Sequence, residues 1–378
     1  MNKLAKGIVL VFIALSSAQL LVACGGGGGG GDNTNPTTTN PSGTLNPKLS
    51  GKFLFEYENN AWLMDISSGD YTKIPNTYWP SHENIFGAAN TFWLDMGATV
   101  YEEYIVATLD DCDNQSAFKY EICVGIQDLN GNYLANYRFL GYAKTPAKLS
   151  NDNQYFAIIN TDQYANEDRL QIYDRTGNLL SSNVVSTEDF DWLDNNKIIY
   201  AEGSKFVVTE ELSTNPDRQL TLPSGLEGTI GDIEVSPQRD KFAFTLTTSG
   251  TLVSSHGTPW VVNVDGTELR QLAVSTSDDP PPSISSPRWS PDGKWILLRE
   301  GAYTGSSSLN PGSSGYAYVV PAENMGKRFV LSIIDQDRSP EVFLLNRYDR
   351  IKTDPSGTVI NKHFSDNVSW IPQRVGQK

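Results

Sequence analysis

Histidine, methionine and cysteine are scarce in this sequence, which has three His, four Met and three Cys among 378 residues. Many catalytic and zinc sites use imidazole, yet His82, His256 and His363 are scattered and form no His-Glu-x-x-His or His-x-His pattern. We interpret each as a loop residue. The sequence also lacks a Gly-x-Ser-x-Gly nucleophile elbow and a phosphate-binding glycine loop. It therefore predicts a protein that is not an enzyme, with no catalytic residue, no metal site and no cofactor.

Basic side chains are also few compared with acidic ones. The chain has 44 Asp and Glu against 29 Lys and Arg, which gives a formal net charge of −15. Nucleic acids repel such a chain unless it carries a local basic stripe, and the sequence shows none. This balance predicts no nucleic-acid partner and no electrostatic attachment to anionic lipid.

Long apolar segments are missing except for one near the N-terminus. Residues 7–21 are largely apolar and follow Lys3 and Lys6, but a bilayer span needs about 20 such residues. A basic start, a short apolar stretch and small residues near Ala23 are typical of a secretion signal. We predict that residues 1–23 are a signal peptide and that no later segment crosses a membrane.

The end of this signal carries a motif, Leu21-Val22-Ala23-Cys24. It resembles the lipobox of bacterial lipoproteins, which implies that Cys24 is acylated, for example with palmitate, and becomes the mature N-terminus. In that family an Asp after the cysteine marks retention in the inner membrane. Because Gly25 stands there, the resemblance implies a lipid anchor in the outer membrane, facing either the periplasm or the cell exterior.

Residues 24–49 have the composition of a linker. Seven consecutive glycines, Gly25 to Gly31, precede a run rich in Asn, Thr and Pro that ends at Pro47. Such a segment buries too little apolar surface to offset its ordering entropy. We predict a disordered tether between the lipid anchor and the rest of the protein.

From residue 50 to residue 375 the chain alternates short aromatic or β-branched runs with turns containing Gly, Asn or Asp, and no helical periodicity is sustained. The clearest unit contains Trp289-Ser290-Pro291-Asp292-Gly293. We expect its Asp-Gly pair to supply the positive backbone dihedrals of a tight hairpin turn. Markers of similar units recur every 42 to 55 residues, a spacing typical of four-stranded propeller blades: Asp95, Ser150, Asp194, Ser236 and Ser290.

A second hairpin accompanies several of these units. It runs from Trp260 to Leu272 and turns at Asp265-Gly266, with relatives in Leu170–Leu180 and Val124–Tyr137. Together the two motifs resemble the β-propeller repeats of the TolB family. That resemblance implies a TolB-like propeller over residues 50–375 and a role in the cell envelope. The chain departs from TolB in its lipobox and in its lack of a separate α/β domain before the propeller.

The two ends of this region are complementary. Residues Lys52 to Ile74 contain three strand-like pieces without a first strand, and Asn367 to Pro372 resembles a first strand with nothing after it. We predict that they pair and close the ring, because closure removes exposed sheet edges. The fold class is thus an all-β, six-bladed propeller of four-stranded antiparallel blades with composite closure. Seven blades remain an alternative if Phe343 to Val359 contains a further blade.

Two further cysteines lie in this region. Cys112 and Cys123 flank a predicted hairpin, and secretion places them in an oxidising compartment, so we predict a disulfide between them. Two acidic clusters, Asp110–Asn114 and Asp335–Glu341, keep calcium open as a weaker alternative.

The function that we predict is a non-catalytic binding scaffold. The anchored propeller, as a single copy, would dock another envelope protein on a loop-lined face or at the channel opening. The alternative is a glycan-binding or lyase-like propeller, whose sugars would stack on exposed tryptophans. The candidates for stacking are Trp62, Trp79, Trp93, Trp260 and Trp289.

Overall fold

The structure is a computed structural model. It describes residues 49, 51–57, 60–66, 71–74, 92–98, 103–110, 121–130, 132–162, 165–187, 189–223, 226–249, 255–276, 283–300, 316–332, 336–345 and 369–370. These residues form 27 strands and no helix. The predicted signal peptide and all but residue 49 of the predicted linker lie outside the described residues.

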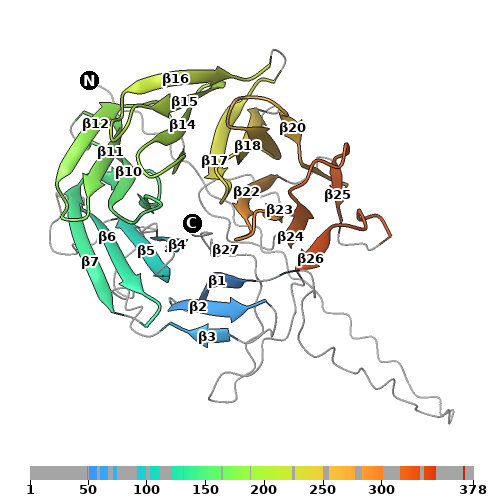
Figure 1. The fold of residues 1–378 in the computed structure, drawn as a ribbon, viewed down its shortest axis with the longest axis horizontal. Helices are drawn as coiled ribbons and strands as arrows, with labels where there is room; N and C mark the ends of the chain where they lie inside the picture. The colour runs from blue at the N-terminus through green and yellow to red at the C-terminus, as the bar shows by residue number, and fades with distance from the viewer. Residues whose placement is uncertain are drawn as a thin grey trace, which may run out of the picture. The chain divides into compact units, whose positions relative to one another are not determined.

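The strands form five four-stranded antiparallel sheets, one five-stranded sheet and one parallel pair (Figure 1). The first two sheets, in spatial order, are β27 (Ser369–Trp370), β1 (Lys52–Tyr57), β2 (Asn60–Asp65), β3 (Tyr71–Lys73); and β4 (Phe92–Ala98), β5 (Glu103–Asp110), β6 (Glu121–Asp128), β7 (Tyr133–Leu140). The next two are β12 (Leu179–Val184), β11 (Asp168–Asp174), β10 (Tyr155–Thr161), with β8 (Tyr142–Ala143) and β9 (Lys148–Leu149) both on β10; and β13 (Phe190–Trp192), β14 (Ile198–Glu202), β15 (Lys205–Thr209), β16 (Pro216–Thr221). The last two are β17 (Thr229–Val235), β18 (Lys241–Ser249), β19 (Ser255–Asn263), β20 (Arg270–Gln271); and β22 (Ile284–Trp289), β23 (Trp295–Glu300), β24 (Tyr316–Pro321), β26 (Phe343–Leu345). The parallel pair is β21 (Ala273–Ser275) and β25 (Phe329–Leu331).

The apolar runs of the sequence become strands that are buried on both faces. In β23, Leu297 packs into one core cluster, whereas Ile296 and Leu298 pack into another on the opposite face of the sheet. This follows from the two-residue period of a strand. Each side chain buried in this way stabilises the fold by roughly 1.5–3 kcal/mol. The second strand of this sheet therefore holds two neighbouring sheets together.

The core is divided among the spaces between sheets. Each of the five core clusters combines side chains of two sheets that follow one another in the chain, except the cluster that joins the first sheet to the last. In that cluster Phe53 and Met64 pack with Leu297 and Val319. Contact between the first and last sheets is what a closed arrangement requires.

The chain ends pair as the sequence predicts. β27 lies antiparallel to β1, with Phe53 opposite Trp370 and Leu54 opposite Ser369. The rings of Phe53 and Trp370 are 4.9 Å apart between centroids. Gly51 precedes β1 at a φ of 105°, and a Cβ atom there would lie 3.0 Å from the Trp370 indole nitrogen and 3.2 Å from Pro291.

The innermost strands follow one another around a common centre (Figure 1). Contacts run from β27 to β4, then to β9, β13, β17 and β22, and β22 contacts β27 again. The described residues thus fold as an all-β propeller, which confirms the predicted propeller class.

Two details of the predicted repeats are wrong or incomplete. Asp95 does not mark a turn. It lies within β4 and pairs with Val106, and β4 continues for three residues beyond it. The letters Trp-Leu-Asp resemble a strand end, but Met96 to Ala98 still pair with β5. Phe343 to Leu345, at the start of the suggested seventh blade, instead forms the outer strand of the sixth sheet, and residues 346–359 lie outside the described part.

Removing the aromatic side chain at the closure should destabilise the whole propeller. Trp370 is 2% exposed and packs on Phe53, so we expect Trp370→Ala to lower the free energy of unfolding by about 3–5 kcal/mol. Urea denaturation followed by circular dichroism measures this loss. Met325→Ala is the control, because Met325 is 45% exposed and should change stability by less than about 0.5 kcal/mol. Equal midpoints for both variants would contradict a closing role for β27.

Candidate functional site

The predicted repeat turn is a compact hydrogen-bonded structure between β22 and β23. The Ser290 hydroxyl donates to Asp292 Oδ1 at 2.6 Å, and its oxygen accepts from the Trp295 backbone N–H at 2.9 Å. The Gly293 N–H donates to the Ser290 carbonyl at 2.9 Å. Ser290 and Pro291 are buried, so the motif residues act in the fold and fix where Trp295 begins its strand.

The same turn recurs in two other sheets. Ser150 bonds to Asp152 at 2.7 Å and Ser236 bonds to Asp240 at 3.0 Å, and each serine oxygen also accepts the backbone N–H five residues further on. The residues that correspond to Gly293 are Asn153 and Arg239, both at a φ of 61°. The sequence copies at Ser150 and Ser236 are thus genuine structural repeats.

The expected backbone of the Asp-Gly pairs needs one correction. Only the glycine has a positive φ, which is 68° at Gly293 and 88° at Gly266, whereas Asp292 and Asp265 do not. The aspartates instead accept backbone N–H groups two residues further on, from Lys294 and Thr267. Their side chains therefore stabilise the turns by hydrogen bonding rather than by conformational freedom.

Carboxylates join the innermost strands of the fourth and fifth sheets. The backbone N–H groups of Ile233 and Val235 in β17 donate to Asp189 and Asp191, each at 2.7 Å. Asp191 lies in β13 and Asp189 directly precedes it. Two acidic residues separated by one residue, at and directly before β13, thus accept hydrogen bonds from alternate backbone N–H groups of β17.

The fifth and sixth sheets are joined in the same way. The N–H groups of Ser286 and Trp289 in β22 donate to Asp232 Oδ2 at 3.0 Å and to Glu234 Oε1 at 2.9 Å. Arg288 also donates to Glu234 Oε2 at 2.9 Å. Both strands bulge near these contacts, and Asp232 and Ser286 have positive φ values of 50° and 53°.

The side chains of Trp192, Trp289 and Lys148 add further hydrogen bonds between the innermost strands. Trp192 donates its indole N–H to the Lys148 carbonyl at 2.9 Å, and Trp289 donates to the Glu234 carbonyl at 3.0 Å. The Lys148 ammonium bonds to Asp189 at 3.2 Å and to the carbonyls of Phe190 and Ile233. With 7% of Lys148 exposed, its charge is used within the fold.

Burial changes the acidity of two of these carboxyls. Burial raises the pKa of Glu234 to about 7, while the Arg288 guanidinium partly opposes the shift. Burial likewise raises the pKa of Asp189 against the lowering effect of Lys148. Protonation of both groups is therefore favoured by the folded state more than by the unfolded chain.

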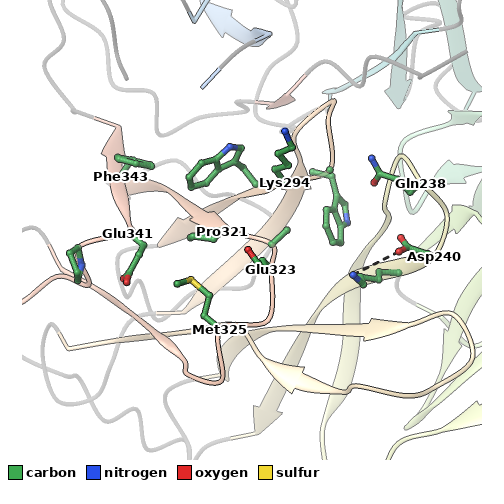
Figure 2. A pocket seen from close by; sticks show the side chains of 14 residues that line it. Gln238, Asp240, Lys294, Pro321, Glu323, Met325, Glu341 and Phe343 are labelled. Atoms are coloured by element: carbon green, nitrogen blue, oxygen red, sulfur yellow. Dashed lines mark ion pairs between the residues drawn. The ribbon is translucent and has the colours of Figure 1, made fainter. Parts of the chain in front are cut away.

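A pocket of about 640 Å³ opens where the fifth and sixth sheets meet. Its walls come from the turn before β18, the turn between β22 and β23, and the segments that follow β24 and precede β26. The volume lies within the range of ligand sites in proteins. In Figure 2, Phe343, Glu341 and Met325 lie on one side and Gln238 and Asp240 on the other. The lining residues are Gln238, Asp240, Lys241, Trp289, Gly293, Lys294, Trp295, Pro321, Ala322, Glu323, Met325, Pro340, Glu341 and Phe343.

One side of the pocket is aromatic and apolar. Trp295 and Phe343 meet edge to face with centroids 5.4 Å apart, and both are partly buried. Met325 is 45% exposed. Aromatic and methionine side chains of this kind provide adaptable contact surface for a ligand.

The charges of the pocket are unevenly compensated. Lys241 and Lys294 each have a carboxylate oxygen at 3.8 Å, from Asp240 and Asp292. Glu341 Oε1 accepts from Lys327 at 2.7 Å, and this contact lowers the pKa of Glu341, which is therefore ionised at neutral pH. Its Oε2 is buried and has no donor among the described residues.

Several predicted site residues cannot be placed. Cys24 and Cys112 lie outside the described residues, and Cys123 is buried in β6, where it pairs with Leu109. The lipid anchor and the disulfide therefore stay predictions. His82, His363 and Trp79 also lie outside this part, and for His256, Trp62 and Trp93 only the backbone is described.

The structure describes the side chains of several other predicted residues. Trp289 is 2% exposed and bonds to Glu234, and Trp260 is partly buried beside a core cluster, so neither offers an open stacking face. Of the two acidic clusters, the structure places the side chains of Asp337 and Glu341, and Glu341 pairs with Lys327. The parts of the chain that can be described contain no group of three or more metal-ligating side chains.

The sequence alone did not single out the aromatic side of the pocket. Trp295 directly follows the repeat turn, but Phe343 is 48 residues further on, and only the pairing of β24 with β26 brings them together. The acid-x-acid pattern at Asp189 and Asp191 was a signal that could have indicated the inner-strand bonds.

Comparison with protein families and with curated proteins gives no match. Among solved structures the chain is similar to the β-propeller domain of the Trilobed protease from Pyrococcus furiosus (15% identity, TM-score 0.36, covering 64% of this chain and 77% of that one). It is also similar to the C-terminal WD40 domain of Sif2 (12%, 0.44, 78% and 86%). A third similar structure is an acylaminoacyl peptidase in complex with Z-Gly-Gly-Phe-chloromethyl ketone (14%, 0.36, 68% and 44%). No helix within the described ranges is long and apolar enough to cross a membrane. The similarity is one of fold.

Adding a methyl group at Gly293 should cost more than adding one at Gly266. Both glycines have a positive φ, where a side chain costs roughly 1–2 kcal/mol. At Gly293 the new Cβ also displaces the amide end of the exposed Gln238 side chain from its hydrogen bond to the Asp292 carbonyl, whereas at Gly266 the nearest atom is 3.6 Å away. Urea denaturation should show a larger loss for Gly293→Ala, and Gln238→Ala in that background should remove the difference. Equal losses for the two glycine variants would contradict the close packing of Gln238.

The stability of the protein should fall as pH rises through the titration of Glu234. Its pKa is about 7 in the folded state against 4.5 for an ordinary Glu, so between these values the folded state binds a proton that the unfolded chain does not. The free energy of unfolding therefore decreases between pH 4.5 and 7, with a contribution from Glu234 of about 3 kcal/mol. Glu234→Gln should flatten this slope while still accepting the Trp289 N–H. Thermal melts across pH 4.5–8 test this, and an unchanged slope would refute it.

Proposed function

We propose that this chain is a lipid-anchored cell-envelope propeller that binds another protein and catalyses no reaction. The observation that carries the proposal is the pocket between the fifth and sixth sheets, which has an aromatic wall and about 640 Å³ of space. Concave sites of this kind, with few polar groups among apolar ones, are typical of binding sites. The partner docks on the propeller face that carries this pocket.

We assign six blades to the propeller and propose that its repeats are TolB-like. This count is supported by the cyclic order of contacts among β27, β4, β9, β13, β17 and β22, each of which is the innermost strand of one sheet. The repeated serine turns at Ser150, Ser236 and Ser290 support repeats of one kind. The parallel pair of β21 and β25 is an addition between blades rather than a blade.

The anchor is proposed at Cys24, after removal of residues 1–23, with residues 24–49 as the tether. Support comes from the lipobox-like Leu21-Val22-Ala23-Cys24 and from the glycine run that follows. Gly25 favours the outer membrane. A disulfide between Cys112 and Cys123 belongs to the same proposal, since β5 and β6 bring Asp110 opposite Ile122.

The anchor predicts how the protein fractionates. Cys24→Ser should move the protein from washed membranes into the soluble fraction, because it loses the acyl chains, each buried methylene of which contributes about 0.8 kcal/mol. High salt should not release the wild type, since the net charge of −15 does not favour attachment to anionic lipid. Immunoblots of the fractions measure both effects. A Cys24→Ser protein that persists in washed membranes would overturn the anchor.

The binding function is tested by cross-linking in the native cell with an affinity tag placed after Lys378. The matched variant is Trp295→Ala, checked for folding by circular dichroism, because Trp295 lines the pocket. A protein captured by the wild type and lost in the variant supports docking at the pocket. Capture that does not depend on Trp295, or no captured protein, would overturn the proposed site.

A further inference from the structure

The outermost strand of the third sheet, β12, is an exposed edge. It ends the strand order of that sheet, and among the described residues it pairs only with β11. Figure 1 shows β12 on the outer rim, outside β11 and β10. A strand in this position presents backbone N–H and C=O groups that a further strand can use for pairing.

The composition of β12 does not block such pairing. Natural edge strands usually carry charged residues or proline, which prevent contact with a foreign strand, or they are very short. Among the outer strands that the structure describes, β3, β7, β16 and β20 each contain a charged residue, and β26 has only three residues. β12 has six residues, and none of them is charged or proline. Its edge is therefore unprotected.

Apolar side chains are exposed along this strand. In the described part of the chain five large hydrophobic side chains are exposed, and three of them lie on β12. Leu179 is 51% exposed, Leu180 44% and Val184 47%. Ser182, between them, is exposed as well. Covering these side chains would remove apolar surface from water, which favours association.

The register with β11 shows which backbone groups of β12 point outward. Directly after β12, Val185 donates its N–H to the carbonyl of the residue opposite, Asp168, at 2.9 Å. In an antiparallel pair the residues that bond to the partner strand alternate with residues that point away from it. Val184 and Ser182 lie one and three positions before Val185 in the same register, so their N–H and C=O groups point away from β11.

This edge is complementary to itself. In an antiparallel pair of two β12 strands with a two-fold axis at Ser182, each Ser182 bonds to its counterpart, and Leu180 lies opposite Val184 on both sides of the axis. The residue that meets its own copy thus has a small, neutral side chain. A chain with a net charge of −15 repels a second copy over most of its surface, so a neutral edge is where two copies can meet.

We infer that two copies of this protein associate through β12 by antiparallel edge pairing, with Ser182 at the two-fold axis. The contact joins the third sheets of the two copies into one continuous sheet. It involves none of the residues that line the pocket, so it does not depend on the proposed partner. This dimer replaces the single copy that the sequence predicted.

The test measures self-association of the full mature chain in density-matched detergent by sedimentation equilibrium. The wild type should dimerise reversibly. Ser182→Lys and Ser182→Glu should each weaken the dimer about tenfold or more, because like charges then lie directly opposite each other. An equimolar mixture of the two variants should restore association, because opposite charges then meet across the axis. A wild type that stays monomeric, or a dimer that both variants leave unchanged, would overturn the inference.

Gln219→Lys is the matched control for these variants. Gln219 is exposed on β16, the outer strand of the next sheet, so the variant adds the same charge to an outer strand elsewhere. It should dimerise as the wild type does, with the fold of each variant checked by circular dichroism. Trp295→Ala should also keep the dimer, which separates this contact from the pocket. If Gln219→Lys weakens the dimer as much as Ser182→Lys, the added charge alone explains the loss and the inference fails.

A cysteine at the axis locates the contact in the native cell. Ser182→Cys should place two thiols at directly opposed positions, with Cα atoms about 5.5 Å apart, where a short bismaleimide can join them. Denaturing gels should then show a band of two joined chains, which Gln219→Cys and the wild type should lack. The absence of this band in Ser182→Cys, or a band that joins this chain to a different protein instead, would overturn pairing with a second copy.

Discussion

Hydrogen bonds between carboxylates of one inner strand and backbone N–H groups of the next join β13, β17 and β22 at the centre of the propeller. An inner strand pairs with only one neighbour in its own sheet, so donors on its other edge would be left without partners in a buried place. Asp189 and Asp191 satisfy β17, and Asp232 and Glu234 satisfy β22. The positions of the fourth, fifth and sixth sheets, and of the turns that shape the pocket, depend on these bonds.

This arrangement has an electrostatic cost that the structure partly offsets. Buried carboxylates are hard to ionise, and the raised pKa of Glu234 and of Asp189 shows it. Lys148 and Arg288 lie among them as counter-charges. Cationic and anionic side chains at the centre are thus used to join strands.

The sequence predicted the fold better than it predicted the site. The Ser290 turn and the Asp265-Gly266 hairpin depend on local patterns and could be found from nearby residues. The pairing of the two chain ends could be inferred because one end lacks a first strand and the other supplies one. Phe343 could not be placed beside Trp295, because their contact depends on the register of β26 against β24. Asp95 was misread for a related reason: a strand end is decided by the partner strand, here β5, and not by the residues of the strand itself.

The closure of the propeller also determines how the structure would carry a pulling force. Gly51, where the chain enters β1, lies against Trp370 and Pro291, so the first strand, the last strand and the turn that borders the pocket meet at one point. A force pulling on the chain at residue 51 would be borne by the six residue pairs between β1 and β2, the two pairs between β1 and β27 and the packing of Phe53 on Trp370. Tension at residue 51 would therefore act on the closing strands and, through Pro291, on the turn that borders the pocket.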